Sequence, residues 1–555
     1  MKFTRRDLLI GTAGAAAGLV LSPVPWKLLS DASIWTQNFP WIPQPAHGPV
    51  GTKYSTCTLC EGGCGIRVRM AGKCPVGVAG VSAHPLTKGA LCPLAFAAHQ
   101  LNWHPRRLRE VRHDGRAASW SEALAAFRKA SSEGPIGIVD GRPGRAASSV
   151  FEAFTQKQQG SYQAVLSAES QALAPYADWS GVPVASLGYD MENARTVVSF
   201  GAPLLDGWGI PGRFTHLWAD RAAGASDPQL RLIQIEPALS RTAARAWQWV
   251  PIRGGSETQL AAGLARVMLE ERLVKSAGPM PHLTLDDAAA QTGLSAGGIR
   301  DLARTMAENR PVVAIAADGN PAIAALNVLL GAVAAPGGIV RIKEDTTPHV
   351  PDAASSPLRA MLLDSTVPWE FAAQADAEVF RFAAWDGGGN TAGWLLPAPG
   401  FLEELTDVPT PPTSARETYS VAMNLAAPAT EVQSAAQFLL NVDATLPAVD
   451  KVIHARCEGI FRARQGTVYG EQTLALSKID SAQHLEEQLR KGAVWMGDPP
   501  RDGRFRCELK EWPTGVGVSP AASWATAWAL PVLPALATKL YQESTLRELP
   551  VGRQA

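Results

Sequence analysis

Four cysteines near the N-terminus have the residue type and the spacing to hold a metal centre. Cys57, Cys60 and Cys64 form a Cys-x2-Cys-x3-Cys run, and Cys92 follows at a distance along the chain. Glycines surround the first three cysteines and let the backbone turn sharply enough to aim three thiolates at one point. Each iron of a 4Fe–4S cube takes one thiolate, so the spacing predicts one 4Fe–4S cluster with these four residues as ligands.

Zinc is the alternative metal for these cysteines. Zinc ribbons usually carry two separate Cys-x2-Cys knuckles, whereas this chain has a clustered trio and one distant cysteine. We therefore favour a 4Fe–4S cluster over zinc. A site that has lost its metal is the third interpretation. The remaining cysteines follow no pairing rule: Cys74, Cys457 and Cys507. Cys457 and Cys507 could form a disulfide in an oxidising compartment, but we favour two separate buried thiols. His84 and His104 flank the site, and neither is expected to be a ligand.

The N-terminus resembles an export signal. Arg5 and Arg6 form a twin-arginine pair, and the uncharged stretch from Leu8 to Leu21 follows. This stretch is short for a membrane span. Twin-arginine export typically carries folded proteins that already hold a cofactor, so the signal agrees with a cluster and predicts the periplasmic side of the cytoplasmic membrane. No clear Ala-x-Ala cleavage site follows, so an uncleaved signal that acts as an anchor stays open.

The composition predicts a large protein with covered surfaces. With 555 residues and 46% apolar content, the chain can bury two or three domain cores. Lys plus Arg equals Asp plus Glu at 51 each, which gives no net attraction to nucleic acid. Charged residues make up only 18%, below the roughly 25% of ordinary soluble domains, and 17 tryptophans are present. Both values indicate surfaces covered by other subunits.

After the cysteine region, short apolar strands alternate with amphipathic helices. We predict strands at residues 65–69, 136–139, 194–200, 230–235, 312–316 and 378–384, and helices at residues 120–130, 258–270, 297–307 and 321–333. Ser119 or Ser121 is expected to cap the first of these helices. The alternation is typical of α/β domains with doubly wound parallel sheets of the dinucleotide-binding kind. Ligands bind at the carboxyl ends of such strands, where Gly201, Glu236, Gly319 and a Gly-rich run at 387–390 stand.

These patterns divide the chain into five parts: a signal or anchor (1–30), an arm with the iron–sulfur domain (31–110), α/β structure (111–345), a second α/β region (346–510) and an extended C-terminal arm (511–555). The arm at 31–49 is rich in Trp and Pro. The segment 512–538 lacks charge, but its four prolines argue against a spanning helix. We expect both arms to bury their aromatic residues on partner subunits.

Together these features resemble the molybdopterin oxidoreductase superfamily from about Cys57 to Glu404. The marks, besides the cysteines, include His84-Pro85, Gly89-Ala90-Leu91-Cys92, the helix start at 119–124, Glu236-Pro237, Pro336-Gly337-Gly338 and Leu396-Pro397. Residues 25–38 and 539–544 further resemble the molybdopterin-oxidoreductase-like subunits of periplasmic menaquinone reductase and alternative complex III-type complexes. This branch implies three partners: a multihaem cytochrome c, a ferredoxin-like iron–sulfur subunit and a polytopic quinone-binding membrane subunit.

The chain departs from the catalytic members of this family. Those members usually carry Cys-x-Lys-Gly at the fourth cysteine, and Leu94 stands here in place of the lysine. Glu236 replaces the usual Asp at the guanosine position, Gly254-Gly255-Ser256-Glu257 replaces Pro-Gly-Thr-Asp, and the short tail predicts that the C-terminal β-barrel lid is absent or reduced. We therefore expect no molybdopterin guanine dinucleotide and no catalytic residue, and interpret the chain as a scaffold and electron relay.

Two alternatives remain. Turns of the dinucleotide-binding kind are retained, which would allow a working molybdenum or tungsten oxidoreductase of unknown substrate. The second alternative is a purely structural subunit without a cofactor, in which the cysteines would be vestigial.

Overall fold

The computed structural model describes residues 4–21, 27–28, 48–223, 229–275, 278–343, 358–367, 377–385, 392–428, 430–500 and 503–513. Residues 31–47 of the predicted arm, the Gly-rich run at 387–390 and the tail from residue 514 lie outside these ranges. The chain forms two units, residues 1–50 and 51–555. In the first unit, α1 (Arg5–Leu21) is an exposed helix of 17 residues. Among the described residues, no helix combines the length and the apolar character needed to cross a membrane.

The second unit begins with a small three-stranded sheet in the order β1-β2-β3. Its strands are β1 (Val50–Thr56), β2 (Gly65–Ala71) and β3 (Cys74–Gly80). In β2 the side chains alternate, with Val68 buried between the exposed Arg67 and Arg69, which confirms the strand predicted at 65–69. Two short helices follow, α3 (Pro93–Ala97) and the 3-10 helix η1 (Ala98–Trp103).

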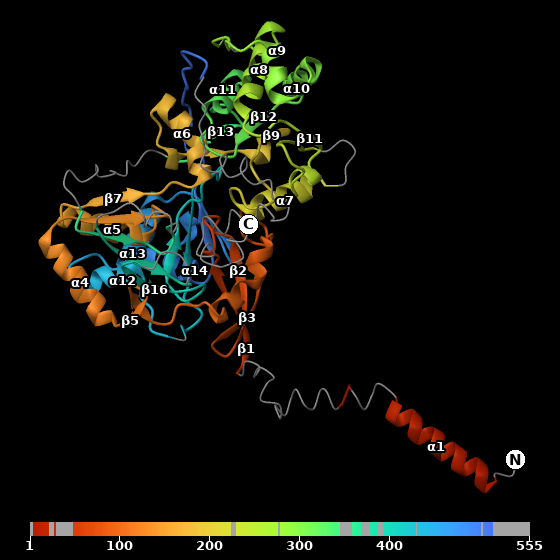
Figure 1. The fold of residues 1–555 in the computed structure, drawn as a ribbon, viewed down its shortest axis with the longest axis vertical. Helices are drawn as coiled ribbons and strands as arrows, with labels where there is room; N and C mark the ends of the chain where they lie inside the picture. Colours follow the sequence, from red (N-terminus) through yellow and green to blue (C-terminus); the bar gives the residue numbers. More distant parts are fainter. Residues whose placement is uncertain are drawn as a thin grey trace. The chain divides into compact units, whose positions relative to one another are not determined.

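A seven-stranded sheet is built from two distant parts of the chain (Figure 1). Its order is β5-β4-β16-β15-β14-β6-β7, and the five strands from β16 to β7 run parallel. The strands are β4 (Val111–His113), β5 (Arg116–Ala118), β6 (Ile136–Asp140), β7 (Ser161–Ala164), β14 (Ala360–Leu363), β15 (Glu378–Ala383) and β16 (Trp394–Pro397). Helices α4 (Trp120–Glu133), α5 (Ala146–Lys157) and α12 (Ala435–Val442) pack on it around Phe127, Phe154 and Phe438.

The segment between the two halves of that sheet folds as a second parallel sheet, in the order β11-β10-β9-β12. Its strands are β9 (Thr196–Phe200), β10 (Arg231–Ile235), β11 (Gln248–Val250) and β12 (Val312–Ala316). The accompanying helices are α6 (Ala168–Ser180), α7 (Pro211–Arg221), α8 (Glu257–Glu270), α9 (Leu285–Thr292), α10 (Ala296–Glu308) and α11 (Pro321–Leu330), and a small pair is formed by β8 (Leu187–Tyr189) and β13 (Ile339–Arg341). Strands β9 and β12 are buried throughout, as near-continuous apolar runs require.

A five-stranded sheet is antiparallel, in the order β17-β18-β21-β19-β20. It consists of β17 (Thr406–Val408), β18 (Thr418–Ala422), β19 (Thr467–Tyr469), β20 (Thr473–Ala475) and β21 (Val494–Met496). Helices α13 (Val449–Ala463) and α14 (Ala482–Arg490) pack together, and Cys457 lies in their core as the buried thiol predicted from the sequence.

The structure corrects one predicted domain boundary. Strands β6 and β14, from opposite sides of the proposed division at 345/346, are direct neighbours in one sheet. The second α/β region at 346–510 therefore divides between the seven-stranded sheet and the antiparallel sheet. Pairing between strands so far apart in the sequence leaves no local signal, because neighbouring strands are selected by packing rather than by sequence distance.

Candidate iron–sulfur site

The cysteine loop connects β1 to β2 and folds back on itself. The Cys57 N–H donates a hydrogen bond to the Cys64 carbonyl oxygen at 2.8 Å, which closes the loop. Gly63 has a φ of 57°, a left-handed conformation that favours glycine. The sharp turn expected from the glycines is therefore present.

The structure brings the four predicted ligands together. Cys57, Cys64 and Cys92 are buried in one apolar core, and the partly exposed Cys60 packs against it. Burial, followed by the charge of the Cys92 thiol, raises the pKa of Cys57 to about 12. Burial also raises the pKa of Cys60, with Cys92 and Cys57 as the next causes. Thiols in such surroundings stay protonated unless a metal centre takes the place of the proton.

The Gly62 N–H donates a hydrogen bond to the Cys60 sulfur at 3.4 Å. The backbone N–H groups of Leu59, of Gly212, and of Leu94 and Ala95 lie near the sulfurs of Cys57, Cys64 and Cys92, and they lower the pKa values of these thiols against the larger effect of burial. Such N–H groups stabilise sulfur that carries negative charge and are one of the means by which proteins tune iron–sulfur potentials. Four thiols in one core with these donors fit a cluster, which would bind through the four sulfurs.

Zinc and a 4Fe–4S cluster require different spacings between the sulfurs. Within the described part of the chain, no group of three or more His, Cys, Asp or Glu side chains is placed as ligands of a single metal ion. One zinc ion draws its sulfurs to about 2.3 Å from a single centre. In a 4Fe–4S cube each thiolate binds a different iron, so the sulfurs stand further apart.

The His84 side chain stabilises the cysteine loop through hydrogen bonds to the backbone. Its Nδ1 accepts hydrogen bonds from the N–H groups of Leu86 at 3.3 Å and Thr87 at 3.2 Å, and the ring also bonds to the Gly63 backbone. A side chain at Gly65 would lie 2.7 Å from the imidazole. Burial lowers the pKa of His84 to about 4, so the ring is neutral at pH 7. The histidine is structural, as the sequence predicted.

Helix α7 of the second sheet begins against the same loop. A Cβ at Gly212 would lie 2.4 Å from the Ala90 carbonyl oxygen, and one at Gly62 would lie 3.3 Å from Pro211. Only glycine lets the helix start approach closely enough for its N–H to reach Cys64. Sequence reasoning missed Gly212, although a Pro-Gly pair at a helix start was a visible signal.

A buried cation lies beside the loop, and sequence reasoning missed it too. Arg142 is 8% exposed and donates to the carbonyl oxygens of Thr58 at 2.5 Å and Leu59 at 2.8 Å. Its charge is near enough to lower the pKa of Cys60 against the larger effect of burial. Leu94, at the position of the family's lysine, packs against the cluster core instead. The sequence offers no local signal for Arg142, because it lies far from Cys60 along the chain.

A cavity of about 920 Å³ opens beside Cys60, between the cysteine loop, the seven-stranded sheet and the antiparallel sheet. Arg142, Arg145, Glu404, Asp407 and Arg456 contribute to its lining. Several of these charges pair with carboxylates of the protein: Arg145 with Asp140 at 2.9 Å and Asp364 at 2.8 Å, and Arg456 with Asp407 at 2.5 Å. Burial raises the pKa of Glu404 to about 7.

Residues 51–101 match the family model of the molybdopterin oxidoreductase Fe4S4 domain. This segment is a molybdopterin oxidoreductase Fe4S4 domain. The chain is similar to the menaquinone reductase, molybdopterin-binding-like subunit, of Nitratidesulfovibrio vulgaris, with 31% identity over 61% of this chain and 52% of that protein. It is also similar to the nitrate-inducible formate dehydrogenase major subunit of Escherichia coli, with 27% identity over 44% of this chain and 27% of that protein. The alignments span about half or less of these relatives.

A solved structure shares the fold. Acetylene hydratase from Pelobacter acetylenicus matches with a TM-score of 0.59 and 15% identity, over 81% of this chain and 74% of that one. At this identity the likeness shows the fold alone. The predicted fold class, parallel α/β sheets behind an N-terminal Fe4S4 domain, is confirmed.

The residues behind the Fe4S4 domain fit a pterin dinucleotide less well than the cysteines fit a cluster. Glu236, at the guanosine position, is 8% exposed and accepts hydrogen bonds from the Ser240 N–H at 3.1 Å and the Gln234 amide at 2.9 Å. Both carboxylate oxygens are therefore engaged within their own strand and turn. Ser256 is also engaged, through its bond to the Arg253 carbonyl at 2.6 Å.

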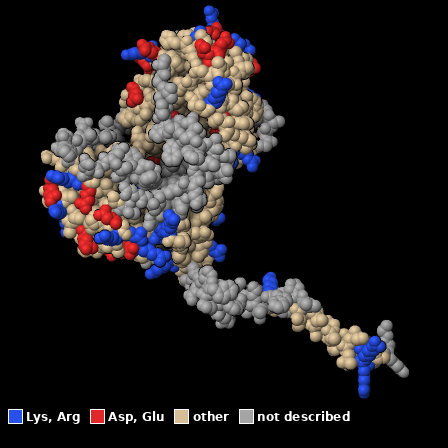
Figure 2. All heavy atoms as spheres, viewed as in Figure 1, with Lys and Arg blue, Asp and Glu red and all other residues tan. Residues whose placement is uncertain are grey.

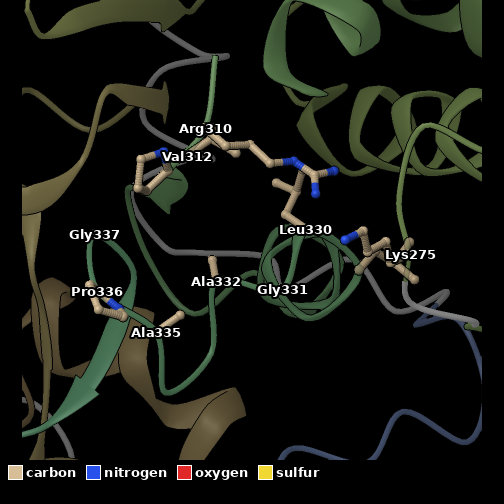
Figure 3. Close-up of a pocket in the computed structure, with 11 residues that line it drawn as sticks. Lys275, Arg310, Val312, Leu330, Gly331, Ala332, Ala335, Pro336 and Gly337 are labelled. Atoms are coloured by element: carbon tan, nitrogen blue, oxygen red, sulfur yellow. The ribbon is translucent and has the colours of Figure 1, made fainter. Parts of the chain in front are cut away.

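A second cavity of about 340 Å³ lies elsewhere in the same unit. Figure 3 shows Arg310 extending over the end of α11 toward Lys275. Arg310 donates to the Leu273 carbonyl at 3.0 Å. The cavity lies where β12 begins, whereas ligands of parallel sheets bind where the strands end. It is therefore not part of the candidate site.

Proposed function

We propose that this chain is a subunit of a membrane-bound quinone oxidoreductase complex and holds one 4Fe–4S cluster through Cys57, Cys60, Cys64 and Cys92. The observation that carries the proposal is the core that contains the four thiols, with the Gly62 N–H donating to the Cys60 sulfur. The similarity to a menaquinone reductase subunit supports the kind of complex.

Within that complex the chain acts as a scaffold and electron relay on the periplasmic side of the cytoplasmic membrane. Its partners are a multihaem cytochrome c, a ferredoxin-like iron–sulfur subunit and a polytopic quinone-binding membrane subunit, and the quinone is menaquinone. The twin-arginine pair supports export of the folded chain.

The chain carries out this role without molybdenum. Leu94 packs in the cluster core where catalytic relatives place a lysine, and Glu236 is engaged in its own turn. A working molybdenum enzyme is the second candidate, because the cavity of about 920 Å³ beside Cys60 is within the usual size range of ligand sites.

Metal analysis of the purified chain and complex tests these roles. We expect about four iron atoms per chain beyond those of the partners, with no stoichiometric molybdenum. One molybdenum per chain, with a pterin nucleotide released by acid, would establish the second candidate. Iron that does not exceed the partners' clusters would leave a structural subunit without cofactor. Co-purification of a tagged chain with the three partners tests the complex, and its failure would overturn that part alone.

A further inference from the structure

The positive charge of this neutral chain is concentrated around the cluster site. Residues 51–110 contain eight Lys or Arg and two Glu, although the whole chain has 51 basic and 51 acidic residues. Arg107 is buried and paired with Glu403. The other seven basic side chains are exposed and form no ion pair with any residue that the structure describes: Lys53, Arg67, Arg69, Lys73, Lys88, Arg106 and Arg109. In Figure 2, Lys and Arg lie along both edges of the part of the second unit that Figure 1 labels β2 and β3, and few carboxylates are visible there.

Exposed apolar side chains are concentrated there too. Among the described residues of the second unit, eight large hydrophobic side chains are exposed, and four of them lie in residues 51–110: Tyr54, Val76, Phe96 and Trp103, against Leu166, Leu239, Trp247 and Met280 elsewhere. Trp103 is 58% exposed and Phe96 50%. Exposure of the Trp and Phe rings to water is unfavourable, and burial of these rings on a partner surface would stabilise the complex.

Three of these apolar residues lie on elements that contact one another. Val76 is on β3, Phe96 on α3 and Trp103 on η1, and each of these elements packs on the other two. Helix α3 begins directly after Cys92. Phe96 therefore lies one helical turn after Cys92 in the sequence, and Trp103 lies on the helix that packs against α3. We call these three residues and the seven unpaired cations the basic–aromatic surface.

An apolar centre with charged surroundings is the usual composition of a protein docking surface. Unpaired positive charge attracts a partner of opposite charge and speeds the encounter. Cations with aromatic residues also suit an anionic lipid surface. Lipid headgroups accept no electrons, however, and this surface includes α3, the helix that begins directly after Cys92.

We propose that the basic–aromatic surface docks an acidic electron-transfer protein, one whose carboxylates surround its own redox centre. The docking itself depends only on the surface. Electron transfer through this surface rests on the proposed function, because it requires the 4Fe–4S cluster. In that step one electron passes from the reduced centre of one protein to the oxidised centre of the other, and no bond is made or broken. The surface thus selects the redox partner by charge.

Binding of an acidic plant-type ferredoxin to the full chain, measured by calorimetry, tests the proposal. We expect the affinity to fall roughly tenfold or more between about 20 mM and about 300 mM salt. Arg67→Glu/Arg69→Glu should weaken low-salt binding by a similar factor. Lys451→Glu/Lys478→Glu is the matched control, because it makes the same change in charge at exposed positions of α13 and η6 (Leu476–Lys478) and should bind like the parent chain.

A second variant separates shape from charge. Trp103→Ser should weaken binding severalfold and leave its salt dependence unchanged, with the iron content and circular dichroism of the parent chain. Equal binding by Arg67→Glu/Arg69→Glu and the control would overturn the proposal. A second result would also overturn the proposal: the parent chain binds phosphatidylglycerol vesicles but not ferredoxin, and Arg67→Glu/Arg69→Glu abolishes the vesicle binding. That result would assign the surface to the membrane. A parent chain without iron would defeat the proposed function, and the calorimetry would still decide the docking.

Discussion

Arg142 donates a hydrogen bond from Nη2 to the carbonyl oxygen of Leu59 at 2.8 Å, within the turn between Cys57 and Cys60. The guanidinium is buried, so water screens its charge little. A full positive charge thus lies beside the cysteine loop, on the side of the large cavity. The resemblance to the catalytic members of the family implies a lysine near the fourth cysteine, and Leu94 occupies that position in this chain.

Arg142 is expected to raise the potential of the cluster. Reduction adds negative charge to the cluster, which a nearby cation stabilises. Arg142→Gln should therefore lower the midpoint potential by roughly 100 mV, the scale of one charge at several ångströms and an effective dielectric constant of about 20. Arg142→Lys keeps the charge and is the control. Redox titration followed by EPR measures both, and equal potentials in parent and Arg142→Gln would contradict the prediction.

Cys60→Ser is expected to remove the cluster or change its EPR signal, because its thiol is one of the four that converge. Cys74→Ser is the matched control, since Cys74 lies at the start of β3 outside the cluster core and should keep its iron. Iron content and the EPR spectrum after reduction measure the result. A Cys60→Ser protein with the iron and the spectrum of the parent would exclude the ligand set.

His84 should make the fold sensitive to acid. Its pKa is about 4 when folded and near 6.5 when unfolded, so between these values the unfolded chain binds more protons. The free energy of unfolding should therefore fall as pH drops from 6.5 toward 4, by up to about 3 kcal/mol from this residue. His84→Asn keeps an acceptor near Nδ1 and does not titrate. Urea unfolding at pH 7 and pH 4.5 should show a smaller loss in the variant; an equal loss would refute the assignment.

The effect of Glu404 on the pH dependence of stability should be opposite to that of His84. Its pKa is about 7 when folded and near 4.5 when unfolded, so the folded chain binds more protons between these values. Stability should decrease as pH rises from 4.5 through 7. At pH 8 the free energy of unfolding of Glu404→Gln, measured with urea, should exceed that of the parent by about 1 to 3 kcal/mol. The lower end of this range allows for solvent screening, because the side chain is partly exposed. Below pH 4.5 the two proteins should differ little, and a constant difference at all pH values would exclude titration of Glu404.

Gly212→Ala should separate α7 from the cysteine loop. The new methyl group would lie 2.4 Å from the Ala90 carbonyl oxygen, so the helix start must move and its N–H withdraws from Cys64. We expect a loss of stability of about 2 kcal/mol or more and a changed cluster spectrum. Gly459→Ala in α13 is the control, because its Cβ meets nothing within 4 Å and a helical alanine is favoured by about 1 kcal/mol. A normal spectrum in Gly212→Ala would contradict the proposed contact.

The features predictable from sequence are those that a short segment specifies by itself. Buried parallel strands such as β12 show an unbroken apolar run, and Ser119 with Glu122 forms the capping box at the start of α4. Helix α11 ends at Leu330 rather than at the predicted 333, because Gly331 adopts the left-handed cap.

What could not be predicted depends on contacts between distant segments. The run of Cys57, Cys60 and Cys64 is visible because its spacing is local, whereas Arg142 and Gly212 reach the site only after the sheets have packed. Neither has a motif of its own.

The cluster core has a consequence for the order of synthesis. Its walls include Trp385, Phe401, Leu402 and Ala426, which lie far downstream of the cysteine loop in the sequence. The loop therefore leaves the ribosome long before the side chains that close its pocket exist. A nascent chain that ends before Trp385 would expose its thiols to solvent, and the insertion of iron must either precede closure or wait until Ala426 has been made. For insertion before closure, the time available is set by the translation of the chain from Cys92 to Ala426.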